Sequence, residues 1–148
     1  SGYKLSQHTF YSPYTRLYQN TNKTATLKCS GDMRDQFSTT SSRGNAKLTY
    51  PTALITADEV ALAGGKYNTK NENYYLRTNG YFWTMTPSYF YASYASAHVW
   101  FVLPSGLLYP WNYVSNWLGV RAVINLRSDL MISSGDGTIE SPYTLKLK

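Results

Sequence analysis

The sequence predicts an α+β fold, in which short helices come early in the chain and antiparallel strands come late. Two patterns indicate this class. Residues 56–65, TADEVALAGG, read as one capped helix, whereas from Tyr81 onward apolar residues recur with a period of two. The length of 148 residues suits one domain with one core. We therefore expect residues 3–148 to form a single domain, and we interpret Ser1-Gly2 as a cleavage scar in front of it.

The first third of the chain has weaker signals. Residues 3–11 alternate loosely and predict a first strand. Ser12 as N-cap and Pro13 in the first helical position predict a short helix through Tyr18. Residues 19–47 are rich in Thr, Ser, Asn and Gly and predict irregular structure, with one short strand at 25–28. Cys29, the only cysteine, leaves no internal disulfide and is expected to be a small buried hydrophobe.

The helix at 56–65 has clear boundaries. Thr56 is expected to cap it, with Glu59 completing a capping box, and Gly64-Gly65 end it. Asp58 and Glu59 also complement the positive end of the helix dipole, so we interpret them as capping residues rather than catalytic ones. Residues 66–80 predict a polar loop with a short strand at 74–76.

The remaining sequence predicts a series of strands. A strand at 82–85 is expected to end before Pro87, and a strand at 98–103 turns at 104–106 and returns from Leu107 as a hairpin. Further strands are predicted at 120–126, of buried type, and at 143–148, with a turn at 134–137. We expect Trp83, Trp100 and Val123 to be buried framework, and Arg121 to bond to carbonyls or a carboxylate, because an unpaired buried charge is costly.

One segment is set apart by composition. Of the 24 aromatic residues, 13 fall between Tyr81 and Trp117, and the 43 positions from 78 to 120 contain no Asp, Glu, Lys or Arg. At the chain's overall 15% charge, about six charged residues would be expected there. The net charge of +6 is spread over the rest of the chain and forms no basic stripe.

The period of two assigns these aromatic residues to faces. Phe101 and Leu103 share a face of the hairpin with Leu107, Tyr109, Trp111 and Tyr113. The opposite face carries Trp100, Val102, Leu108, Pro110, Asn112 and Val114. A mixture of Tyr, Trp and Phe with Asn and Ser is typical of a binding surface, because Tyr offers a large contact area for two torsions. We expect the first face to be exposed for binding.

The motifs FWTMTPS, HVWFV, GVRAVINL and SGDGTIESPYTL resemble those of a bacterial C-type-lectin-like domain, which is related to the formylglycine-generating enzyme fold. The resemblance covers roughly residues 46–145. It implies small twisted antiparallel sheets with two short helices and with the terminal strands at 3–10 and 143–148 paired. It also implies a domain of surface or pilin-like proteins, of the kind that diversity-generating retroelements rewrite. Segment 88–118 contains no Met, Lys, Glu or Gln, as rewritten AAC or AAT codons require, although Trp111 and Trp117 lie outside that set.

The resemblance and the residue pattern together predict an extracellular ligand-binding domain at a bacterial cell surface, with its variable segment at about 88–118. The partner would be a protein or a glycan on another cell or surface, with no nucleic acid, no membrane insertion, no cofactor, no metal and no enzymatic activity. The expected ligand-binding residues are Tyr91, Tyr94, His98, Phe101, Leu103, Leu107, Tyr109, Trp111, Asn112, Tyr113, Asn116 and Trp117.

Other functions are less well supported by the residues. A formylglycine-generating enzyme needs a paired thiol site, which one cysteine does not provide. Calcium-dependent sugar binding needs converging carboxylates, and the charge-free segment has none. Binding to single-stranded nucleic acid needs aromatic residues interleaved with Lys and Arg, whereas here the two are segregated. Calcium-independent binding of glycans stays open, as does a structural pilin domain without diversification.

Overall fold

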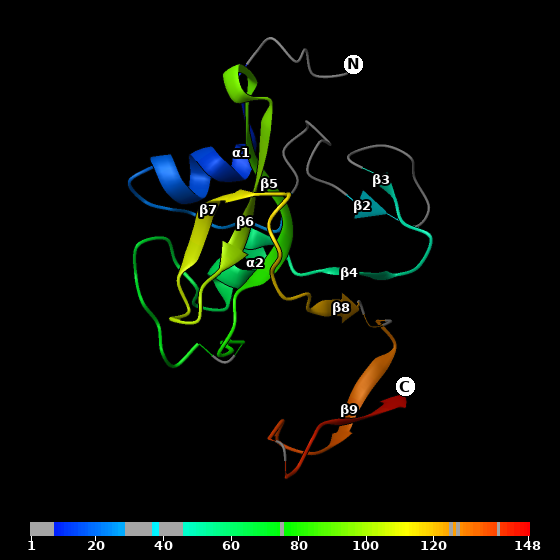
Figure 1. Cartoon of the computed structure of the whole chain (residues 1–148). Helices are drawn as coiled ribbons and strands as arrows, with labels where there is room; N and C mark the ends of the chain where they lie inside the picture. Colours follow the sequence, from blue (N-terminus) through cyan, green and yellow to red (C-terminus); the bar gives the residue numbers. More distant parts are fainter. Residues whose placement is uncertain are drawn as a thin grey trace.

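The computed structural model describes residues 8–28, 37–38, 46–74, 76–124, 126, 128–138 and 140–148, with the backbone alone at 37, 38 and 46. Its largest sheet has four antiparallel strands (Figure 1). In spatial order they are β1 (Thr9–Phe10), β5 (Phe82–Tyr91), β6 (Ser96–Val102) and β7 (Leu108–Tyr113).

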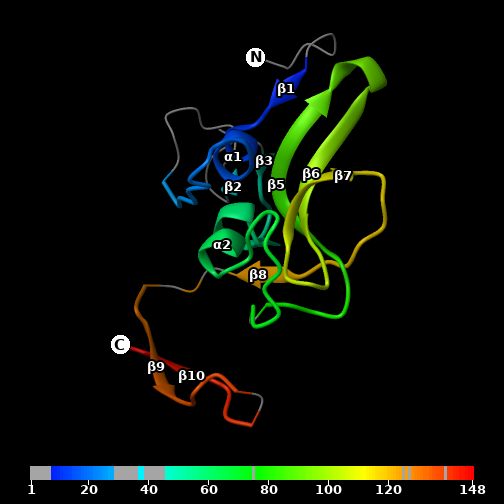
Figure 2. The same ribbon diagram turned by 90° about the vertical axis from the view of Figure 1, so that its left-hand side faces the viewer.

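The helical segments lie on one side of this sheet, and the chain that follows β7 loops past its other side (Figure 2). The helical segments are α1 (Ser12–Tyr14), which continues into the π-helical turn η1 (Thr15–Gln19), and α2 (Ala57–Leu62). A 3₁₀ turn, η3 (Ala92–Tyr94), joins β5 to β6. Mainly antiparallel strands with a few short helices confirm the predicted α+β class. None of the helices in the described ranges is long and apolar enough to span a bilayer.

Three smaller strand pairs complete the described structure. They are the antiparallel pair β4 (Thr52–Leu54) and β8 (Ala122–Ile124), the parallel pair β2 (Phe37–Ser38) and β3 (Ala46–Lys47), and the antiparallel pair β9 (Leu130–Ser134) and β10 (Thr144–Leu147). The expected pairing of the terminal strands is wrong, because β1 pairs with β5 and β10 pairs with β9. The local β9–β10 hairpin closes a short loop, which costs less entropy than joining the two ends of the chain. Figure 2 shows β1 and β10 at opposite ends of the molecule.

The alternation in FWTMTPS builds the central strand β5. Phe82, Thr84, Thr86 and Ser88 are buried on the side that faces the helices. Each hydroxyl has a partner: Thr84 donates to the Trp100 carbonyl at 2.8 Å, Thr86 accepts from the Ala57 N–H at 2.9 Å, and Ser88 donates to the Pro110 carbonyl at 2.5 Å. Small hydroxyl side chains therefore let the start of α2 approach the sheet closely without leaving buried polar groups unpaired.

The predicted end of this strand before Pro87 is wrong. The strand β5 continues through Pro87 to Tyr91, and Pro87 pairs with Val99. Register shifts lie on both sides of Pro87, so the hydrogen-bond ladder is already interrupted where the proline lacks its N–H.

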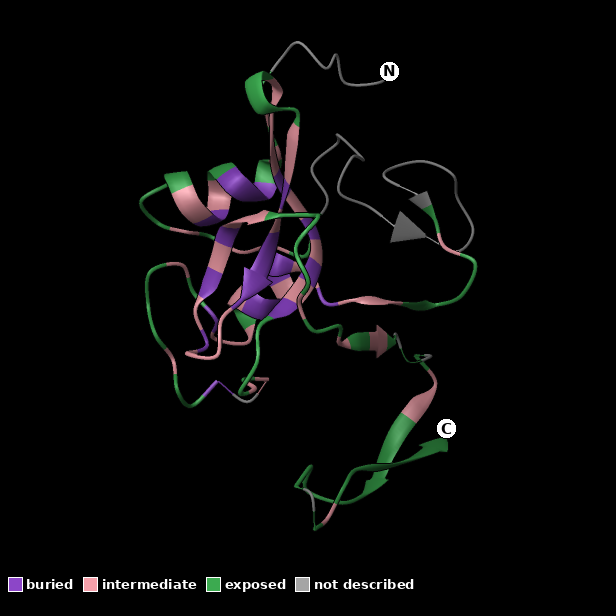
Figure 3. Ribbon diagram, in the orientation of Figure 1, coloured by how far each residue is buried: buried purple, intermediate pink, exposed green. Residues whose placement is uncertain are grey.

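The core lies between the sheet and α2 (Figure 3). Trp100 is fully buried there, as expected, but Trp83 and Val123 are only half-buried, so the framework prediction is wrong for those two. Trp83 pairs with Phe101 on the side of β5 away from the described helices, and Val123 lies on the short strand β8, outside the large sheet. The buried cluster consists of Leu17, Ile55, Ala57, Val60, Tyr74, Phe82, Trp100, Val102 and Leu108.

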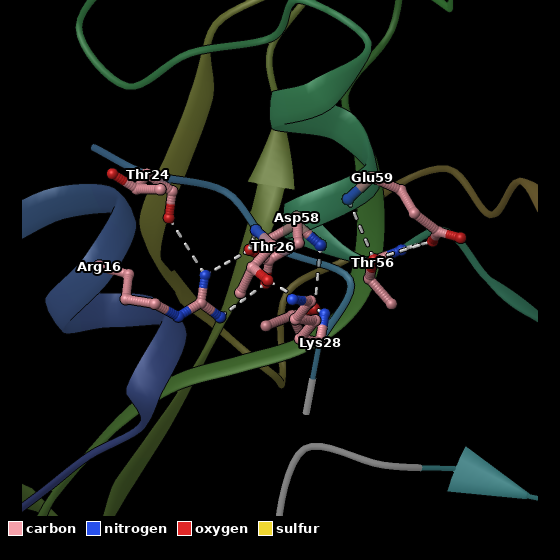
Figure 4. Close-up of polar contacts among 9 residues, drawn as sticks. Arg16, Thr24, Thr26, Lys28, Thr56, Asp58 and Glu59 are labelled. Carbon is pink, nitrogen blue, oxygen red and sulfur yellow. Dashed lines mark hydrogen bonds and ion pairs between the residues drawn. The ribbon is translucent and has the colours of Figure 1, made fainter. Parts of the chain in front are cut away.

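The capping box of α2 is confirmed. The Glu59 N–H donates to Thr56 Oγ1 at 3.1 Å, and the Glu59 carboxylate accepts from the Thr56 N–H at 2.8 Å. Asp58 has a second role that the sequence did not reveal: its carboxylate binds the Arg16 guanidinium through both oxygens and accepts from the Thr26 N–H at 2.9 Å (Figure 4). This buried carboxylate therefore joins η1 and the segment after it to α2.

The other local predictions have mixed outcomes. The helix from Ser12 is confirmed, although Tyr11 rather than Ser12 is its N-cap. The β6–β7 hairpin and the last strand are also confirmed. Residues 25–28 form no strand, and neither do Tyr74 and Leu76; Tyr75 and Cys29 lie outside the described residues.

The region around Arg121 was predicted in part. Arg121 Nη1 donates to the Leu76 carbonyl, and its guanidinium lies 5.1 Å from the centre of the Phe82 ring, which confirms a structural role. The strand itself, β8, is shorter than expected. It pairs with β4 in a separate two-stranded sheet rather than within the large sheet, and Ile124 is exposed, so the prediction of a buried strand is wrong.

Candidate ligand-binding surface

Rings from all four strands of the large sheet line up in one cross-strand row. Phe10 pairs with Tyr89, Tyr89 with His98, and His98 with Tyr113. Directly paired residues lie on the same side of a sheet, so the four rings share the side that carries the helices. The Tyr89 and His98 rings are stacked, 4.1 Å apart at an angle of 9°, and the Tyr113 ring lies 4.5 Å from His98. We call Phe10, Tyr89, His98 and Tyr113 the ring row.

Tyr14 of α1 covers the half of the ring row that contains Phe10 and Tyr89. Its ring stacks on Phe10 at 5.0 Å and contacts Tyr89 at 5.4 Å, and its hydroxyl accepts from Trp111 Nε1 at 3.4 Å. Tyr14 and His98 are buried, whereas Phe10 and Tyr113 are 51% and 50% exposed. The ring row is therefore buried in the middle and open at both ends.

A second group of rings lies beyond the row, where β5 and β6 project past the helices. The Tyr91 and Tyr94 rings are stacked in nearly parallel planes, with centres 5.1 Å apart and an angle of 13° between them. The His8 ring meets Tyr91 edge-on at 4.1 Å. Ser93 Oγ lies 3.4 Å from His8 Nε2. We call His8, Tyr91, Ser93 and Tyr94 the hairpin tip; Figure 3 shows this end of the hairpin exposed at its turn.

A third group surrounds the edge strand β7. Tyr18 of η1 contacts both Tyr67 and Trp111 at 4.8 Å, and Tyr109 contacts Trp111 at 4.9 Å and Tyr67 at 5.8 Å. We call Tyr18, Tyr67, Tyr109 and Trp111 the edge cluster. Tyr109 also meets Phe101 at 5.8 Å, so the contacts continue around the edge of the sheet to its other side.

The expectation that Tyr109, Trp111 and Tyr113 share one face is wrong. Tyr109 pairs with Phe101, but Asn112 pairs with Val99, so Pro110 and Trp111 together lie opposite Trp100 alone. This β-bulge reverses the alternation. Tyr109 lies on the side away from the helices, whereas Trp111 and Tyr113 lie on the helix side.

The twelve expected site residues are therefore not one flat patch. His98 and Phe101 are buried, and Leu103 and Leu107 close the turn at the opposite end of β6 and β7 from Tyr113, where the Leu103 N–H donates to the Leu107 carbonyl at 2.9 Å. Asn112 is half-buried and accepts from the side-chain amide of Asn116. Exposure is highest at Tyr94 and Trp117, which are 77% and 98% exposed.

Several members of these groups were missed from sequence. Tyr14 and Tyr18 are four residues apart, which places them on one side of a helix, and this spacing was available as a signal. His8 and Phe10 are two residues apart, as expected for one side of a strand, but Phe10 meets Tyr89 only because β1 pairs with β5, which lies far away in the sequence. Tyr67 lies in a polar loop, and no sequence pattern points to it.

Four rings of this surface, those of Tyr14, Tyr67, Tyr89 and His98, are uncharged at neutral pH. Burial raises the pKa of the Tyr14, Tyr67 and Tyr89 hydroxyls, so they stay protonated. Burial also lowers the pKa of His98 from its ordinary 6.5, which keeps the imidazole neutral. Its Nε2 lies 3.3 Å from Ser96 Oγ, while Nδ1 is buried with no hydrogen-bond partner among the described residues. Lys23 lies at the margin, 5.2 Å from the centre of the Tyr67 ring.

The chemistry that these rings offer is stacking and hydrogen bonding. Within the described part of the chain, no three His, Cys, Asp or Glu side chains are grouped so that they could hold a metal ion. Stacked and edge-on rings contribute about 0.5–1.5 kcal/mol each beyond their area, and the exposed rings offer flat apolar faces. Comparison of the chain with protein-family models, with curated proteins and with solved structures found no match.

Proposed function

We propose that this chain is an extracellular ligand-binding domain of the adhesin or receptor type, with a C-type-lectin-like fold and a Tyr-rich binding face. The observation that carries the proposal is the set of ring contacts that joins the ring row to the edge cluster through Tyr14, with the rings of the hairpin tip two residues further along β5. Exposed aromatic patches of this kind mark interaction sites in proteins.

The construction of the surface suits recognition. Its exposed rings lie on strands of the sheet or in the turn that joins two of them: Phe10 on β1, Tyr94 in η3 between β5 and β6, and Tyr113 on β7. Because β5, β6 and β7 also supply residues of the core, little order has to be gained on binding. Tyr, Asn and Ser are the residue types that binding surfaces favour, because they combine a large contact area with adaptable hydrogen bonds.

The proposal extends to diversification by a retroelement. Tyr94, Tyr113, Asn116 and Trp117 are exposed within segment 88–118, while Trp100, Val102 and Leu108 in the same segment are buried. Exposed positions tolerate replacement far better than buried ones. If the exposed residues vary while the buried ones stay fixed, the ligand can change and the fold is kept. A cell-surface location in a bacterium, with a protein or glycan ligand, follows from the same proposal.

The test compares binding by two multiple variants. Tyr94→Ala/Tyr113→Ala removes two exposed rings of the proposed face, and Tyr50→Ala/Tyr143→Ala removes exposed rings elsewhere. Each is screened, with the parent chain, against immobilised surface proteins and glycans. We expect the first variant to lose the ligands that the parent and the control variant retain, with unchanged melting temperatures. Equal binding by all three proteins would falsify the assignment of the binding face.

A further inference from the structure

The hairpin tip presents one aromatic ring with an open face. Tyr91 stacks against one side of Tyr94, and Tyr94 is nevertheless 77% exposed. The exposed area must therefore lie on the opposite face and the rim of the ring. A flat ring that is supported from behind and open in front can receive another flat apolar surface.

The backbone holds this ring in place. The strand pair Tyr91↔Ser96 closes the hairpin, and the Ala95 N–H donates to the Ala92 carbonyl at 3.1 Å. Ala95 has a φ of 47°, a left-handed conformation that costs a non-glycine residue energy and persists only where its surroundings impose it. The position of Tyr94 is thus fixed before any ligand arrives, which favours binding.

A second open ring, Tyr113, lies at one end of the ring row. Tyr91 pairs with Ser96 and Tyr89 with His98, so both tyrosines lie on the same side of β5, two residues and about 7 Å apart. The stack Tyr89–His98–Tyr113 then extends across the sheet to Tyr113, which is half exposed. Tyr94 and Tyr113 are therefore the open ends of two adjacent ring arrays.

The polar groups beside these rings are neutral hydroxyls and amides, apart from the His8 imidazole, which meets Tyr91 and Ser93 at the hairpin tip. The neutral groups are the hydroxyls of Ser93 and of the tyrosines, together with the amides of Asn112 and Asn116, and residues 78–120 carry no charged side chain. A charged ligand would lose water there without gaining a counter-charge. A ligand that suits the surface has an apolar face to stack and hydroxyl groups to exchange hydrogen bonds.

On the basis of the proposed binding function, we propose that Tyr94 and Tyr113 form a stacking site for neutral saccharides that needs no metal ion. The C–H faces of a pyranose ring lie on the tyrosine rings, and its hydroxyl groups meet the neutral hydroxyls and amides around them. The site differs from a calcium-dependent sugar site, because no carboxylate lies in the segment that forms the tip and the end of β7.

The small exposed area of these rings and the lack of charge around them favour a saccharide over larger ligands. Phe10, Tyr94 and Tyr113 expose on the order of 300–400 Å² together, about half of the roughly 800 Å² that each partner contributes to a stable protein interface. Single-stranded nucleic acid stacks on similar rings but also needs Lys or Arg along its backbone, and residues 78–120 contain neither.

The experiment titrates the whole chain with short neutral oligosaccharides of glucose, mannose, galactose and xylose, and with uronic-acid and sulfated oligosaccharides as charged counterparts. Binding is followed by NMR shifts of the sugar C–H protons and by calorimetry, with and without EDTA. Tyr94→Ala and Tyr113→Ala are compared with Tyr50→Ala, which removes a tyrosine outside the site that is about as exposed as Tyr94 (73% against 77%).

We expect at least one neutral oligosaccharide to bind, with ring-current shifts on its C–H protons and no effect of EDTA. Affinity should fall by roughly tenfold or more in Tyr94→Ala and Tyr113→Ala and stay unchanged in Tyr50→Ala. The saccharide site is overturned if no neutral oligosaccharide binds, if EDTA abolishes binding, or if Tyr50→Ala weakens binding equally. If the surface-protein panel yields a ligand that depends on these rings while every saccharide fails, the proposed function stands without the saccharide site. If both screens fail, both proposals fall.

Discussion

The two ends of strands β6 and β7 use the same backbone pairing but face different surroundings. At one end, Val102 pairs with Leu108, and both are at most 1% exposed beneath α2. At the other end, His98 pairs with Tyr113 and stacks on Tyr89, which Tyr14 of the short α1–η1 segment contacts. Aliphatic side chains and Trp100 fill the first end, whereas tyrosine and histidine rings fill the second.

This difference shows how one sheet can be both core and candidate binding surface. An aliphatic residue left half exposed gains little, but a tyrosine keeps its hydroxyl in water while its ring stacks on a neighbour. The core end should therefore determine stability, and the ring end should determine ligand choice. Each of the following predictions tests that division.

The largest effect is expected from Trp100→Ala at the core end. Removing a fully buried indole leaves a cavity, and we expect the free energy of unfolding to fall by about 3–5 kcal/mol. Chemical denaturation measures the change. Trp117→Ala is the matched control, because the same residue type at 98% exposure should change stability by no more than about 0.5 kcal/mol. Similar losses for both variants would contradict the division.

A smaller effect is expected from Asp58→Asn, which tests how the ring-bearing segment is attached to the core. The substitution removes the ion pair with Arg16 while the amide oxygen can still accept from the Thr26 N–H. We expect a loss of about 1–3 kcal/mol in the free energy of unfolding, because the pair is partly buried. A double-mutant cycle with Arg16→Met isolates the pair; a coupling energy near zero would show that the contact is not stabilising.

The pH dependence of stability tests His98 in the ring row. Burial lowers its pKa in the folded state below the ordinary 6.5, so the unfolded chain binds the proton more readily. Its contribution is therefore complete above pH 6.5 and is lost as the pH falls through the lowered folded-state pKa. Denaturation midpoints from about pH 8 to about pH 5 measure the loss. His98→Phe keeps a ring in the row and should flatten the profile between these limits; an unchanged profile would show that His98 does not carry the pH dependence.

The smallest stability effect is expected at the hairpin tip. Tyr94→Ala removes a ring that is mostly exposed, so the free energy of unfolding should change by about 0.5 kcal/mol or less. Its melting temperature should therefore be close to that of Tyr50→Ala. Differential scanning fluorimetry compares the two variants. If Tyr94→Ala is destabilising on the scale of Trp100→Ala, the tip is part of the core and is not a binding surface.

Local patterns in the sequence determined several features of this protein. The capping box of Thr56 and Glu59, the Pro13 helix start, the β6–β7 hairpin around Gly106 and the burial of Trp100 all follow from neighbouring residues. Gly106 has a φ of +75°, and an added Cβ would collide with the Asn71 carbonyl, so this turn depends on glycine. The charge-free, aromatic composition of residues 78–120 also pointed to the candidate surface before any contact was known.

The tertiary structure decided which rings meet. Period-two alternation predicts faces only while the register is regular, and the bulge at Pro110 and Trp111 reversed the alternation within one strand. Pairing over long sequence distances brought Phe10 of β1 to Tyr89, and helix packing brought Tyr14 to Trp111. Composition determined that an aromatic, uncharged surface would form, because composition does not depend on register. Which rings are buried, stacked or open was decided by strand pairing and helix packing, because these contacts join residues that no local pattern connects.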